Sequence, residues 1–572
     1  MNKKKKLASS AAALISVTVA AGITAYAVQN YSADDLRNLS SSLLGESALS
    51  EGQDVNNDGR IDVFDLVEMR KSFLNSGEFY ANIFPATQEN VRYIGRNFYS
   101  GDTVWLVQSG SAIEFTVTGR RASVNLFGDG TIAEDEKYRP RYAVIVDGEI
   151  IADSLLASGD ETVMLFDGEV SRTATVQVIH LSEANNSAVG VAGISVDSNA
   201  PKPIAPTAKK DLQIEFIGDS ITCAYGVEGK DQYENFKTST ENFMKSYAYL
   251  TAKQLNADYS AVCYSGHGII SGYSSGDEKV TDSLVPDYYD YVGKIDDYRI
   301  PWDFEANEND VVVINLGTND DSYASKALEE RAPEFAEKYE EFLEQVHDRN
   351  PNAYIICTLG TMGCTELYPY IEEAVENFRK ATGYDRIMSY QSAVQDFADG
   401  LGSDWHPSEV TQQNSAYVLA DKICQALGME SDQIGIDVAA DVEFDSTQTD
   451  SAHMSAYFSE WDRSYHVTTV NGGESRESIR ITAGKIGLKK DGVYKLQFKI
   501  DTSAGEKIPF TLKNAATGEI LFEDTFVGAG EKSLYETEVI CPQTCDGELE
   551  FLMGGTDSLR LSLYDLKMVK TK

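Results

Sequence analysis

A serine that follows an apolar stretch is the first residue of this sequence with the surroundings of a nucleophile. Residues 217–222 read IGDSIT, so that Ser220 comes directly after a predicted buried strand and before a predicted helix. In a doubly wound fold, ligands bind at the carboxyl edge of the sheet, where this position lies. A serine hydroxyl is a poor nucleophile unless a base lies within hydrogen-bond distance. The Gly-Asp-Ser tripeptide alone is equally compatible with an ordinary strand-to-helix turn.

Three further blocks supply the other polar groups that a hydrolytic site needs. They are YSGHG at 264–268, NLGTND at 315–320 and SDWHPS at 403–408. Each block lies at the end of a predicted strand or in the loop that follows it, in the order Ser220, Gly266, Asn319, His406. We therefore expect the four side chains or backbone groups to meet at one edge of the sheet.

This order of blocks resembles that of the SGNH hydrolases, and the resemblance covers about residues 212–428. It implies that Ser220 attacks an ester carbonyl, while His406 accepts the serine proton and later delivers it to the leaving alcohol. It also implies an oxyanion hole built from the backbone N–H groups of Ser220 and Gly266 and the side-chain amide of Asn319.

Two details of the proton relay stay open. Gly268 is the alternative to Gly266 as an oxyanion donor. His267, which lies between the two glycines, is predicted to be a rim or packing histidine rather than the base. The superfamily usually places the acid of the triad three residues before the histidine, where this chain has Ser403. Asp404 lies only two residues before it. We therefore favour a Ser–His dyad whose imidazole donates to a backbone carbonyl near Ser403, with Asp404 as the alternative third member.

Buried strands and helices alternate around these blocks. Strands are expected at 212–217, 311–316 and 353–359, and helices at 243–255, 327–347, 370–381 and 411–427. Strands buried on both faces, each followed by a helix, indicate a parallel sheet between two helical layers. We assign an α/β/α catalytic domain to residues 209–430.

Short alternating runs with polar turns flank this domain. They predict a jelly-roll-like β-sandwich over residues 79–205 and a second β-sandwich over residues 436–572. Residues 201–210, PKPIAPTAKK, are predicted to be a stiff linker. The C-terminal sandwich resembles the carbohydrate-binding modules of families 4, 9 and 22 in strands such as GVYKLQF at 492–498.

The sandwich directly before the catalytic domain narrows the resemblance to carbohydrate esterase family 2, together with WDF at 302–304 and DWHP at 404–407. This resemblance implies a metal-free acetyl esterase acting on acetylated plant polysaccharides such as xylan or glucomannan. Trp405, Trp302 and Tyr273 would then stack on sugar rings, with core packing as the alternative for each. The rival interpretations are an SGNH lipase or thioesterase with a long apolar acyl channel, and a non-catalytic glycan-binding protein.

A calcium loop is predicted in an N-terminal segment, residues 28–78. Residues 54–65 read DVNNDGRIDVFD, with glycine at the sharp turn in position 6. The candidate ligands are Asp54, Asn56, Asp58, Asp62, Asp65 and the carbonyl of Arg60. The loop and the helix after it resemble a dockerin repeat of the cellulosome, which implies docking to a cohesin-bearing scaffold protein. Dockerins normally carry two such loops, and only one is complete here.

The first residues indicate export. Residues 3–6 are lysines, residues 7–23 are mostly apolar, and AYA at 25–27 is typical of a cleavage site, so that residues 1–27 are predicted to be a secretory signal peptide. We expect a secreted, extracellular protein without a membrane span in its mature form. The 572 residues carry 49 basic and 90 acidic side chains, a formal net charge of −41, which argues against nucleic acid or an anionic membrane as partner.

Overall fold

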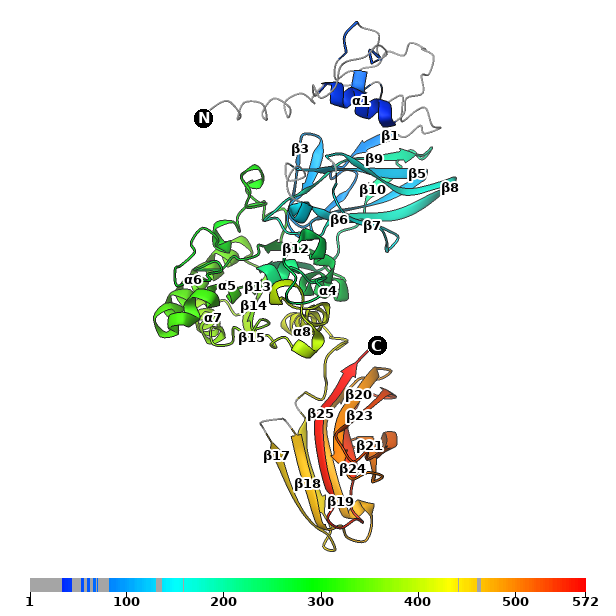
Figure 1. The fold of residues 1–572 in the computed structure, drawn as a ribbon, viewed down its shortest axis with the longest axis vertical. Coiled ribbons are helices and arrows are strands. Elements are labelled where there is room, and N and C mark those ends of the chain that lie inside the picture. Colours follow the sequence, from blue (N-terminus) through cyan, green and yellow to red (C-terminus); the bar gives the residue numbers. More distant parts are fainter. Residues whose placement is uncertain are drawn as a thin grey trace. The chain divides into compact units, whose positions relative to one another are not determined.

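The computed structural model describes residues 33–43, 53–55, 59–61, 65–67, 69, 82–129, 136–157, 159–440, 442–459 and 464–572. The chain divides into two compact units, Met1–Ala416 and Tyr417–Lys572 (Figure 1). The predicted signal peptide lies outside the described residues. Among the helices that the structure describes, none is both long and apolar enough to cross a membrane.

A parallel five-stranded sheet, in the order β12-β11-β13-β14-β15, lies at the centre of the first unit. Its strands are β11 (Gln213–Gly218), β12 (Asp258–Cys263), β13 (Val311–Asn315), β14 (Tyr354–Leu359) and β15 (Ile387–Gln391). Because every residue of β13 is buried, its sequence is an uninterrupted apolar run up to Asn315, and the predicted parallel sheet is confirmed. Strand β15 was not predicted, since it is an edge strand and is only partly buried.

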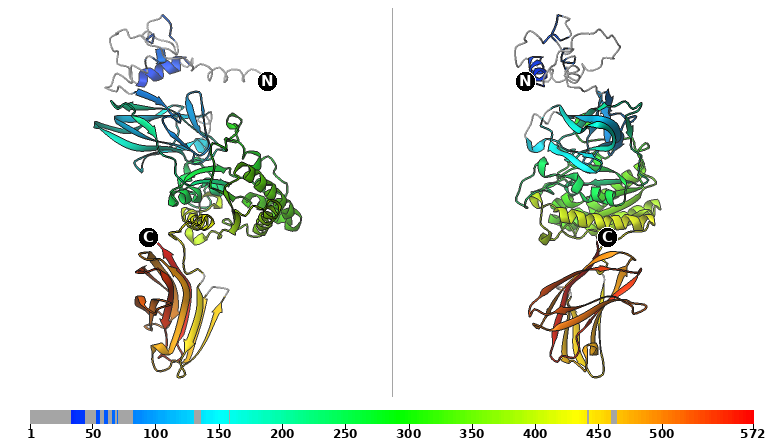
Figure 2. Two further views of the ribbon diagram at one scale, coloured as in Figure 1. Left: turned by 180° about the vertical axis from the view of Figure 1, so that it is seen from behind. Right: turned by 90° about the vertical axis from the view of Figure 1, so that its right-hand side faces the viewer.

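Helices cover both faces of this sheet (Figures 1 and 2). The helices are α3 (Ser220–Cys223), α4 (Tyr247–Gln254), α5 (Thr318–Ala324), α6 (Leu328–Arg349), α7 (Tyr368–Thr382) and α8 (Glu409–Leu427). Apolar side chains of α6 and α7 share one core with Ile217 and Ile314. On the other face, Phe216 of β11 contacts Tyr247 of α4 edge-on, at 6.2 Å between ring centres.

The region before the sheet is built from antiparallel strands. They are β1 (Asn82–Pro85), β2 (Arg92–Ile94), β3 (Asn97–Ser100), β4 (Thr103–Leu106), β5 (Ala112–Gly128), β6 (Arg141–Val146), β7 (Glu149–Leu155), β8 (Glu161–His180), β9 (Val189–Asp197) and β10 (Ile204–Pro206). Strand β5 pairs with β2 and β10 along its first half and with β9 along its second half, and β8 pairs with it along most of its length. Hydrogen bonds thereby link all ten strands around one apolar core.

The predicted linker is wrong for part of its length, because Ile204–Pro206 forms strand β10 on β5. Proline is compatible with a strand at a sheet edge, where its missing N–H is not needed. The next residues are also held in place, since Thr207 donates a hydrogen bond to Glu114 and the backbone N–H of Lys210 donates one to Asp258. The connection is therefore part of the folded unit.

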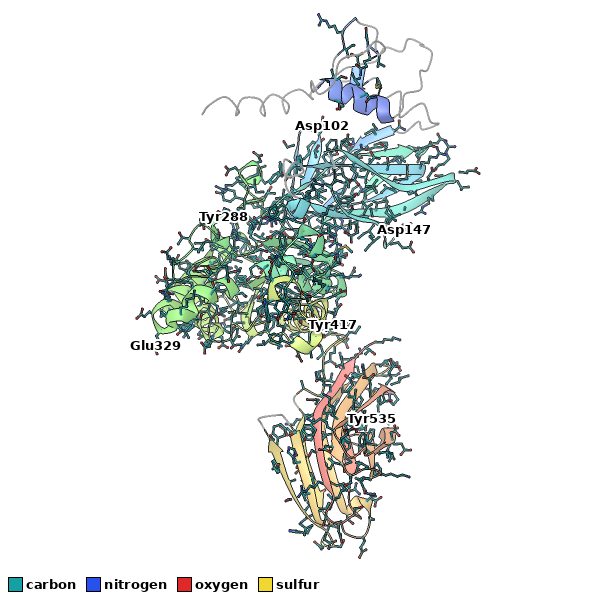
Figure 3. The ribbon with its side chains drawn as sticks, viewed as in Figure 1. Asp102, Asp147, Tyr288, Glu329, Tyr417 and Tyr535 are labelled. Atoms are coloured by element: carbon teal, nitrogen blue, oxygen red, sulfur yellow. The ribbon has the colours of Figure 1, made fainter. Side chains whose placement is uncertain are left out.

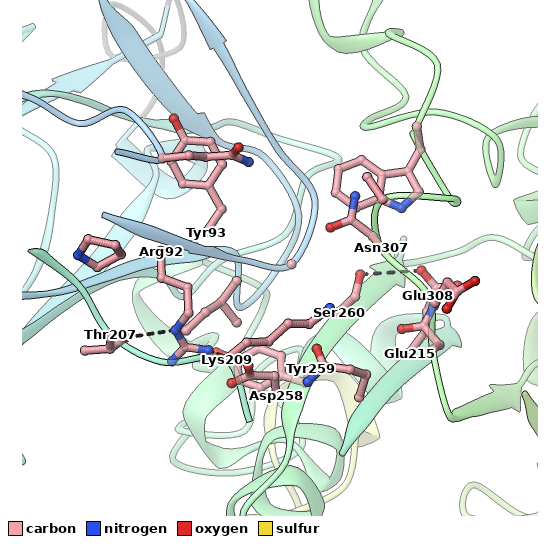
Figure 4. Close-up of a pocket in the computed structure, with 18 of the residues that line it drawn as sticks. Arg92, Tyr93, Thr207, Lys209, Glu215, Asp258, Tyr259, Ser260, Asn307 and Glu308 are labelled. Atoms are coloured by element: carbon pink, nitrogen blue, oxygen red, sulfur yellow. Dashed lines mark hydrogen bonds and ion pairs between the residues drawn. The ribbon is translucent and has the colours of Figure 1, made fainter. Parts of the chain in front are cut away.

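The β-rich region packs tightly on the catalytic sheet. Arg96 forms an ion pair of 2.9 Å with Glu215 of β11, and both side chains are completely buried. The side chains of Val107 and Ala184 join the core of the α/β layer. A pocket of about 320 Å³ lies along the same contact, where Arg92 reaches Asp258 (Figure 4). Many charged side chains instead point to solvent, among them Asp147 and Glu329 (Figure 3).

The second unit contains two five-stranded antiparallel sheets around a single apolar core. One sheet consists of β16 (Glu443–Gln448), β19 (Ile479–Leu488), β24 (Cys545–Leu552), β21 (Lys507–Asn514) and β22 (Ile520–Val527). The other consists of β17 (His453–Ser459), β18 (Ser464–Asn471), β25 (Arg560–Lys570), β20 (Val493–Thr502) and β23 (Ser533–Ile540). The C-terminal β-rich region agrees with the predicted second sandwich.

Candidate active site

Ser220 is the first residue of α3, a single helical turn at the carboxyl end of β11. Asp219 caps this turn, and its carboxylate accepts a hydrogen bond of 3.0 Å from the backbone N–H of Ile221. Glycine is required at 218, because a Cβ atom there would lie 2.0 Å from the hydroxyl oxygen of Thr222. The strand and the turn together hold the Ser220 hydroxyl at the edge of the sheet.

His406 lies within hydrogen-bond distance of this serine. Its Nε2 atom is 2.9 Å from Ser220 Oγ, and its Nδ1 atom is 3.1 Å from the carbonyl oxygens of both Ser403 and Asp404. Carbonyl oxygens only accept hydrogen bonds, so Nδ1 carries the proton and Nε2 presents its lone pair to the serine. Burial lowers the pKa of His406 to about 4, which keeps the imidazole unprotonated at physiological pH, with the Nε2 lone pair free to accept the serine proton.

The carboxylate of Asp404 makes its hydrogen bonds to groups other than the imidazole. Its Oδ2 atom accepts hydrogen bonds from the hydroxyl of Tyr225 at 2.8 Å and from the backbone N–H of Phe236 at 3.1 Å. Asp404 and Trp405 both have left-handed backbone conformations, with φ of 50° and 68°. This turn places the carbonyls of Ser403 and Asp404 next to Nδ1 of His406. The alternative of a Ser–His–Asp triad is therefore wrong for the Asp404 side chain, and the favoured dyad agrees with the geometry.

Gly266 and Asn319 line the same pocket as Ser220 and His406, a cavity of about 600 Å³. Gly266 has φ of +77°, and no atom lies within 4 Å of where its Cβ would be. The side-chain amide of Asn319 donates to the carbonyl of His267 at 2.8 Å, which orients it. The same amide nitrogen makes a longer hydrogen bond of 3.4 Å to Asp219, which a substrate oxyanion can replace.

Neither Gly268 nor His267 takes a catalytic position. A Cβ atom at Gly268 would lie 2.1 Å from the carbonyl oxygen of Ser271, so this glycine serves close packing rather than the pocket. His267 is almost fully buried, with Nδ1 2.9 Å from the carbonyl of Ser265 and Nε2 2.8 Å from the ammonium of Lys294. Burial, followed by the charge of Lys294, lowers its pKa to about 4. The predicted packing role of His267 agrees with these contacts.

Comparison with known proteins identifies the domains that carry this geometry. Residues 216–413 match the GDSL-like lipase/acylhydrolase family, and residues 93–206 match the N-terminal domain of carbohydrate esterase family 2. An acetylxylan esterase/glucomannan deacetylase of Cellvibrio japonicus is 30% identical over 270 residues, which are 44% of this chain and 70% of that protein. The chain belongs to carbohydrate esterase family 2.

Other family 2 proteins extend the match. A family two carbohydrate esterase from Clostridium thermocellum, solved in complex with cellohexaose, is 31% identical with a TM-score of 0.52. The alignment covers 59% of this chain and 99% of that one. The cellulase/esterase CelE of Acetivibrio thermocellus is 33% identical over 330 residues, which are 56% of this chain but only 37% of CelE. For the part of the chain that these relatives match, the prediction of a carboxylic-ester hydrolase is confirmed.

Two functional residues of this esterase were missed in the sequence. Asp320 is buried and accepts hydrogen bonds from the backbone N–H groups of Ile269, Ile270 and Ser271, which holds the loop that follows Gly266. Burial raises the pKa of Asp320 to about 6. Tyr225 contacts the imidazole of His406, at 4.2 Å between ring centres. Asp320 could have been found from the sequence, because it is an acidic residue within the NLGTND block. The sequence around Tyr225 contains no motif that would have indicated its contact with His406.

The three predicted sugar-stacking residues have different outcomes. Tyr273 lines the pocket and is 64% exposed. Trp405, 45% exposed, lies next to the dyad and contacts the exposed Tyr233 edge-on at 5.7 Å. The prediction for Trp302 is wrong, because its indole lies against the guanidinium of Arg96. It borders a pocket near the amino ends of the strands, at the opposite edge of the sheet from Ser220.

The predicted calcium loop is described only in part. Asn56, Asp58 and Asp62 lie outside the described residues, and Asp54, Arg60 and Asp65 lie within them. The backbone N–H of Val55 donates to Asp65 at 2.7 Å, and that of Gly59 donates to Asp54 at 3.0 Å. Gly59 has φ of +82°, as the sharp turn at position 6 requires. The predicted carboxylate, amide and carbonyl donors suit a hard cation such as Ca²⁺, and calcium binding stays a prediction.

Proposed function

We propose that this protein is a secreted acetyl esterase that removes O-acetyl groups from plant cell-wall polysaccharides such as xylan or glucomannan. The observation that carries the proposal is the 2.9 Å contact between Ser220 Oγ and His406 Nε2, in a pocket also lined by Gly266 and Asn319. Family 2 membership supports acetylated glycans as the substrate class, since two relatives are named acetylxylan esterase/glucomannan deacetylase.

Acylation starts with the neutral imidazole. As Ser220 Oγ attacks the carbonyl carbon of the acetyl ester, its proton passes to Nε2 of His406. The imidazolium that forms is stabilised by the carbonyls of Ser403 and Asp404, which accept its Nδ1–H. The oxyanion lies against the N–H groups of Ser220, Gly266 and Asn319, and each such donor stabilises the transition state by ~3–4 kcal/mol.

The tetrahedral intermediate then collapses. The C–O bond to the sugar breaks, and His406 delivers its proton to the leaving sugar hydroxyl, which leaves an acetyl group on Ser220. A water molecule attacks this ester with His406 again as the base, and acetate departs as the serine regains its proton. Base, nucleophile and oxyanion donors all come from the protein, so the proposed reaction needs no metal.

The pocket fits a short acyl group on a sugar. Besides the dyad it is lined largely by polar residues: Ser265, Asn319, Asp321, Ser322, Thr318 and Tyr225, together with Tyr273 and Met362. A long acyl chain would leave the hydroxyl and carboxylate groups of such a lining without solvent or partners. The aromatic faces of Trp405 and Tyr273 are available to stack on a sugar ring. This lining disfavours the lipase alternative.

We further propose that the N-terminal segment attaches the enzyme to a scaffold. The proposal is supported by the sequence of residues 54–65, which helix α1 (Ala33–Leu43) precedes in the same segment. Calcium would be held by Asp54, Asn56, Asp58, Asp62 and Asp65 with the carbonyl of Arg60, and it would order the loop for a cohesin. Secretion through the predicted signal peptide, and glycan binding by the C-terminal sandwich, belong to the same proposal.

The test is acetate release from acetylated xylan, glucomannan and pectin by the full chain, with Ser220→Ala as control. We expect release from at least one glycan by the wild type and a loss of several orders of magnitude in Ser220→Ala. Release of acetate should also exceed release of octanoate from matched esters. A wild type that prefers octanoate would favour the lipase, and near-normal turnover by Ser220→Ala would disprove the mechanism.

A further inference from the structure

A buried glutamate from the N-terminal β-rich region reaches the rear of the oxyanion hole. Glu183 lies in the connection between β8 and β9 and is 2% exposed. Its Oε2 atom accepts a hydrogen bond of 2.8 Å from the backbone N–H of Ser265, the residue before Gly266. The same oxygen lies 3.9 Å from the thiol of Cys223, in the helical turn that begins at Ser220.

We propose that Glu183 is a positioning residue of the oxyanion hole, so that the N-terminal β-rich region is an obligatory part of the active site. The inference rests on the proposed function, because it concerns the same reaction. Glu183 does not touch the substrate, and it acts through the backbone of residues 265–266.

The conformation of Gly266 explains why such an anchor is needed. No side chain packs where a Cβ of this glycine would be, and glycine is the residue with the widest choice of backbone conformations. The direction of its N–H is therefore set by the neighbours on either side. On the far side, Asn319 holds the carbonyl of His267, and Asp320 holds the N–H groups of residues 269–271. On the near side, Glu183 holds the N–H of Ser265.

A second buried acid keeps Glu183 in place. Glu241 accepts a hydrogen bond of 3.0 Å from the backbone N–H of Glu183, and its other oxygen, Oε1, has no hydrogen-bond partner. Burial, followed by the charge of Glu183, raises the pKa of Glu241 well above its usual range, which disfavours a second negative charge beside Glu183. Burial also raises the pKa of Glu183, and the hydrogen bond from Ser265 and the nearby ammonium of Lys294 oppose this shift.

The β-rich region adds further contacts to the same loop. The amide of Gln108 donates to the hydroxyl of Tyr264 at 2.6 Å, and the side chain of Asn185 lies 3.4 Å from the ammonium of Lys294, which in turn contacts His267. These residues come from two separate connections of the β-rich region. The loop that carries Gly266 is thus fixed from outside the α/β layer.

The test compares three substitutions in the full chain. Glu183→Gln keeps an oxygen that can accept from Ser265, Glu183→Asp keeps the charge but shortens the side chain by one methylene, and Glu183→Ala removes the acceptor. Glu149→Ala, an exposed glutamate of β7, is the matched control. The readouts are kcat and KM on 4-nitrophenyl acetate, the melting temperature, and the rate at which a fluorophosphonate labels Ser220.

We expect kcat to fall about 10- to 100-fold in Glu183→Asp and about 100-fold in Glu183→Ala, with KM changed less than about threefold, because an oxyanion donor acts mainly in the transition state. Glu183→Gln and Glu149→Ala should stay within about threefold of wild type. If Glu183→Ala does not fold, Glu183→Asp decides. A folded Glu183→Asp with unchanged kcat and labelling rate would overturn the inference.

The labelling rate separates this inference from the proposed function. The phosphonyl oxygen of the probe occupies the oxyanion hole whatever acyl group the enzyme prefers. If the wild type releases no acetate but is labelled faster than Glu183→Asp, the proposed function fails and the positioning role stands. If the wild type releases acetate and Glu183→Asp matches it, the proposed function stands and the positioning role fails.

Discussion

Replacing Asp404 by Asn tests whether backbone carbonyls alone orient His406. In a Ser–His–Asp triad the same replacement costs about 10⁴-fold in kcat, or about 5.5 kcal/mol, because it favours the wrong imidazole tautomer. In this structure the side chain of Asp404 instead accepts hydrogen bonds from Tyr225 and Phe236, and an Asn oxygen can accept both. Asn also tolerates the left-handed backbone at this position, where φ is 50°.

The expected loss follows from the contacts that change. The substitution removes the negative charge of the acceptor, which weakens each of the two hydrogen bonds by about 1 kcal/mol. Only part of this lost free energy affects the transition state. We therefore expect kcat/KM of Asp404→Asn to fall by less than about tenfold, or about 1.4 kcal/mol. The carbonyls that accept from Nδ1 are unaffected by the substitution.

The assay is the initial rate of acetate release, with the melting temperature as a measure of folding. Asp404→Ala is the comparison, because it removes both hydrogen bonds and strains the left-handed turn. We expect it to be less active and less stable than Asp404→Asn. A folded Asp404→Asn enzyme that has lost a thousandfold or more in kcat would refute the dyad.

Four further outcomes are expected. Asn319→Ala should lower kcat by about 10²–10³-fold with little change in KM, since one oxyanion donor is lost; this is measured on 4-nitrophenyl acetate, and a purely KM effect would contradict it. Because the folded-state pKa of His406 is lowered to about 4, the base is active above that value, and kcat/KM should rise between about pH 3 and 5 and then stay level; a midpoint near 6.5 would contradict this. Trp405→Ala should raise KM for acetylated glycan while leaving hydrolysis of a small aryl acetate within about threefold, and equal effects on both would argue against stacking. A calcium chelator should abolish binding to a cohesin, measured by calorimetry, and leave acetate release intact; a loss of hydrolysis would point to a metal-dependent reaction.

The parallel sheet was predictable because strands that are buried on both faces have continuous apolar sequences. Strands β11, β13 and β14 are covered on both faces, so their apolar runs marked them within one or two residues. Strand β15 has no such apolar run, since most of its side chains are only partly buried. The linker prediction failed at Ile204–Pro206 for a related reason. Its prolines indicate a break in structure, yet an edge strand accepts them.

The catalytic residues were predictable in type but not in all their partners. Ser220, Gly266, Asn319 and His406 each follow or precede an element whose position in the sheet could be predicted, so their convergence followed from topology. Trp302 shows the limit of this reasoning. Its sequence block fits the family pattern, but its side chain packs on Arg96, a residue more than two hundred positions earlier in the chain, and no local pattern reports such a contact.

The contacts that orient His406 could not be predicted from the sequence, because backbone groups make them. The atoms that orient His406 are carbonyls of Ser403 and Asp404, and every residue has a carbonyl, so residue type cannot reveal which one is used. The sequence does contain an aspartate at position 404, where the backbone is left-handed, and aspartate tolerates this conformation. The turn orients the two carbonyls toward His406. The side chain of Asp404 also stabilises this turn, because its oxygen accepts hydrogen bonds from Phe236 and Tyr225. An acid two residues before the histidine therefore serves the dyad by shaping the backbone, and the usual triad spacing has no bearing on that role.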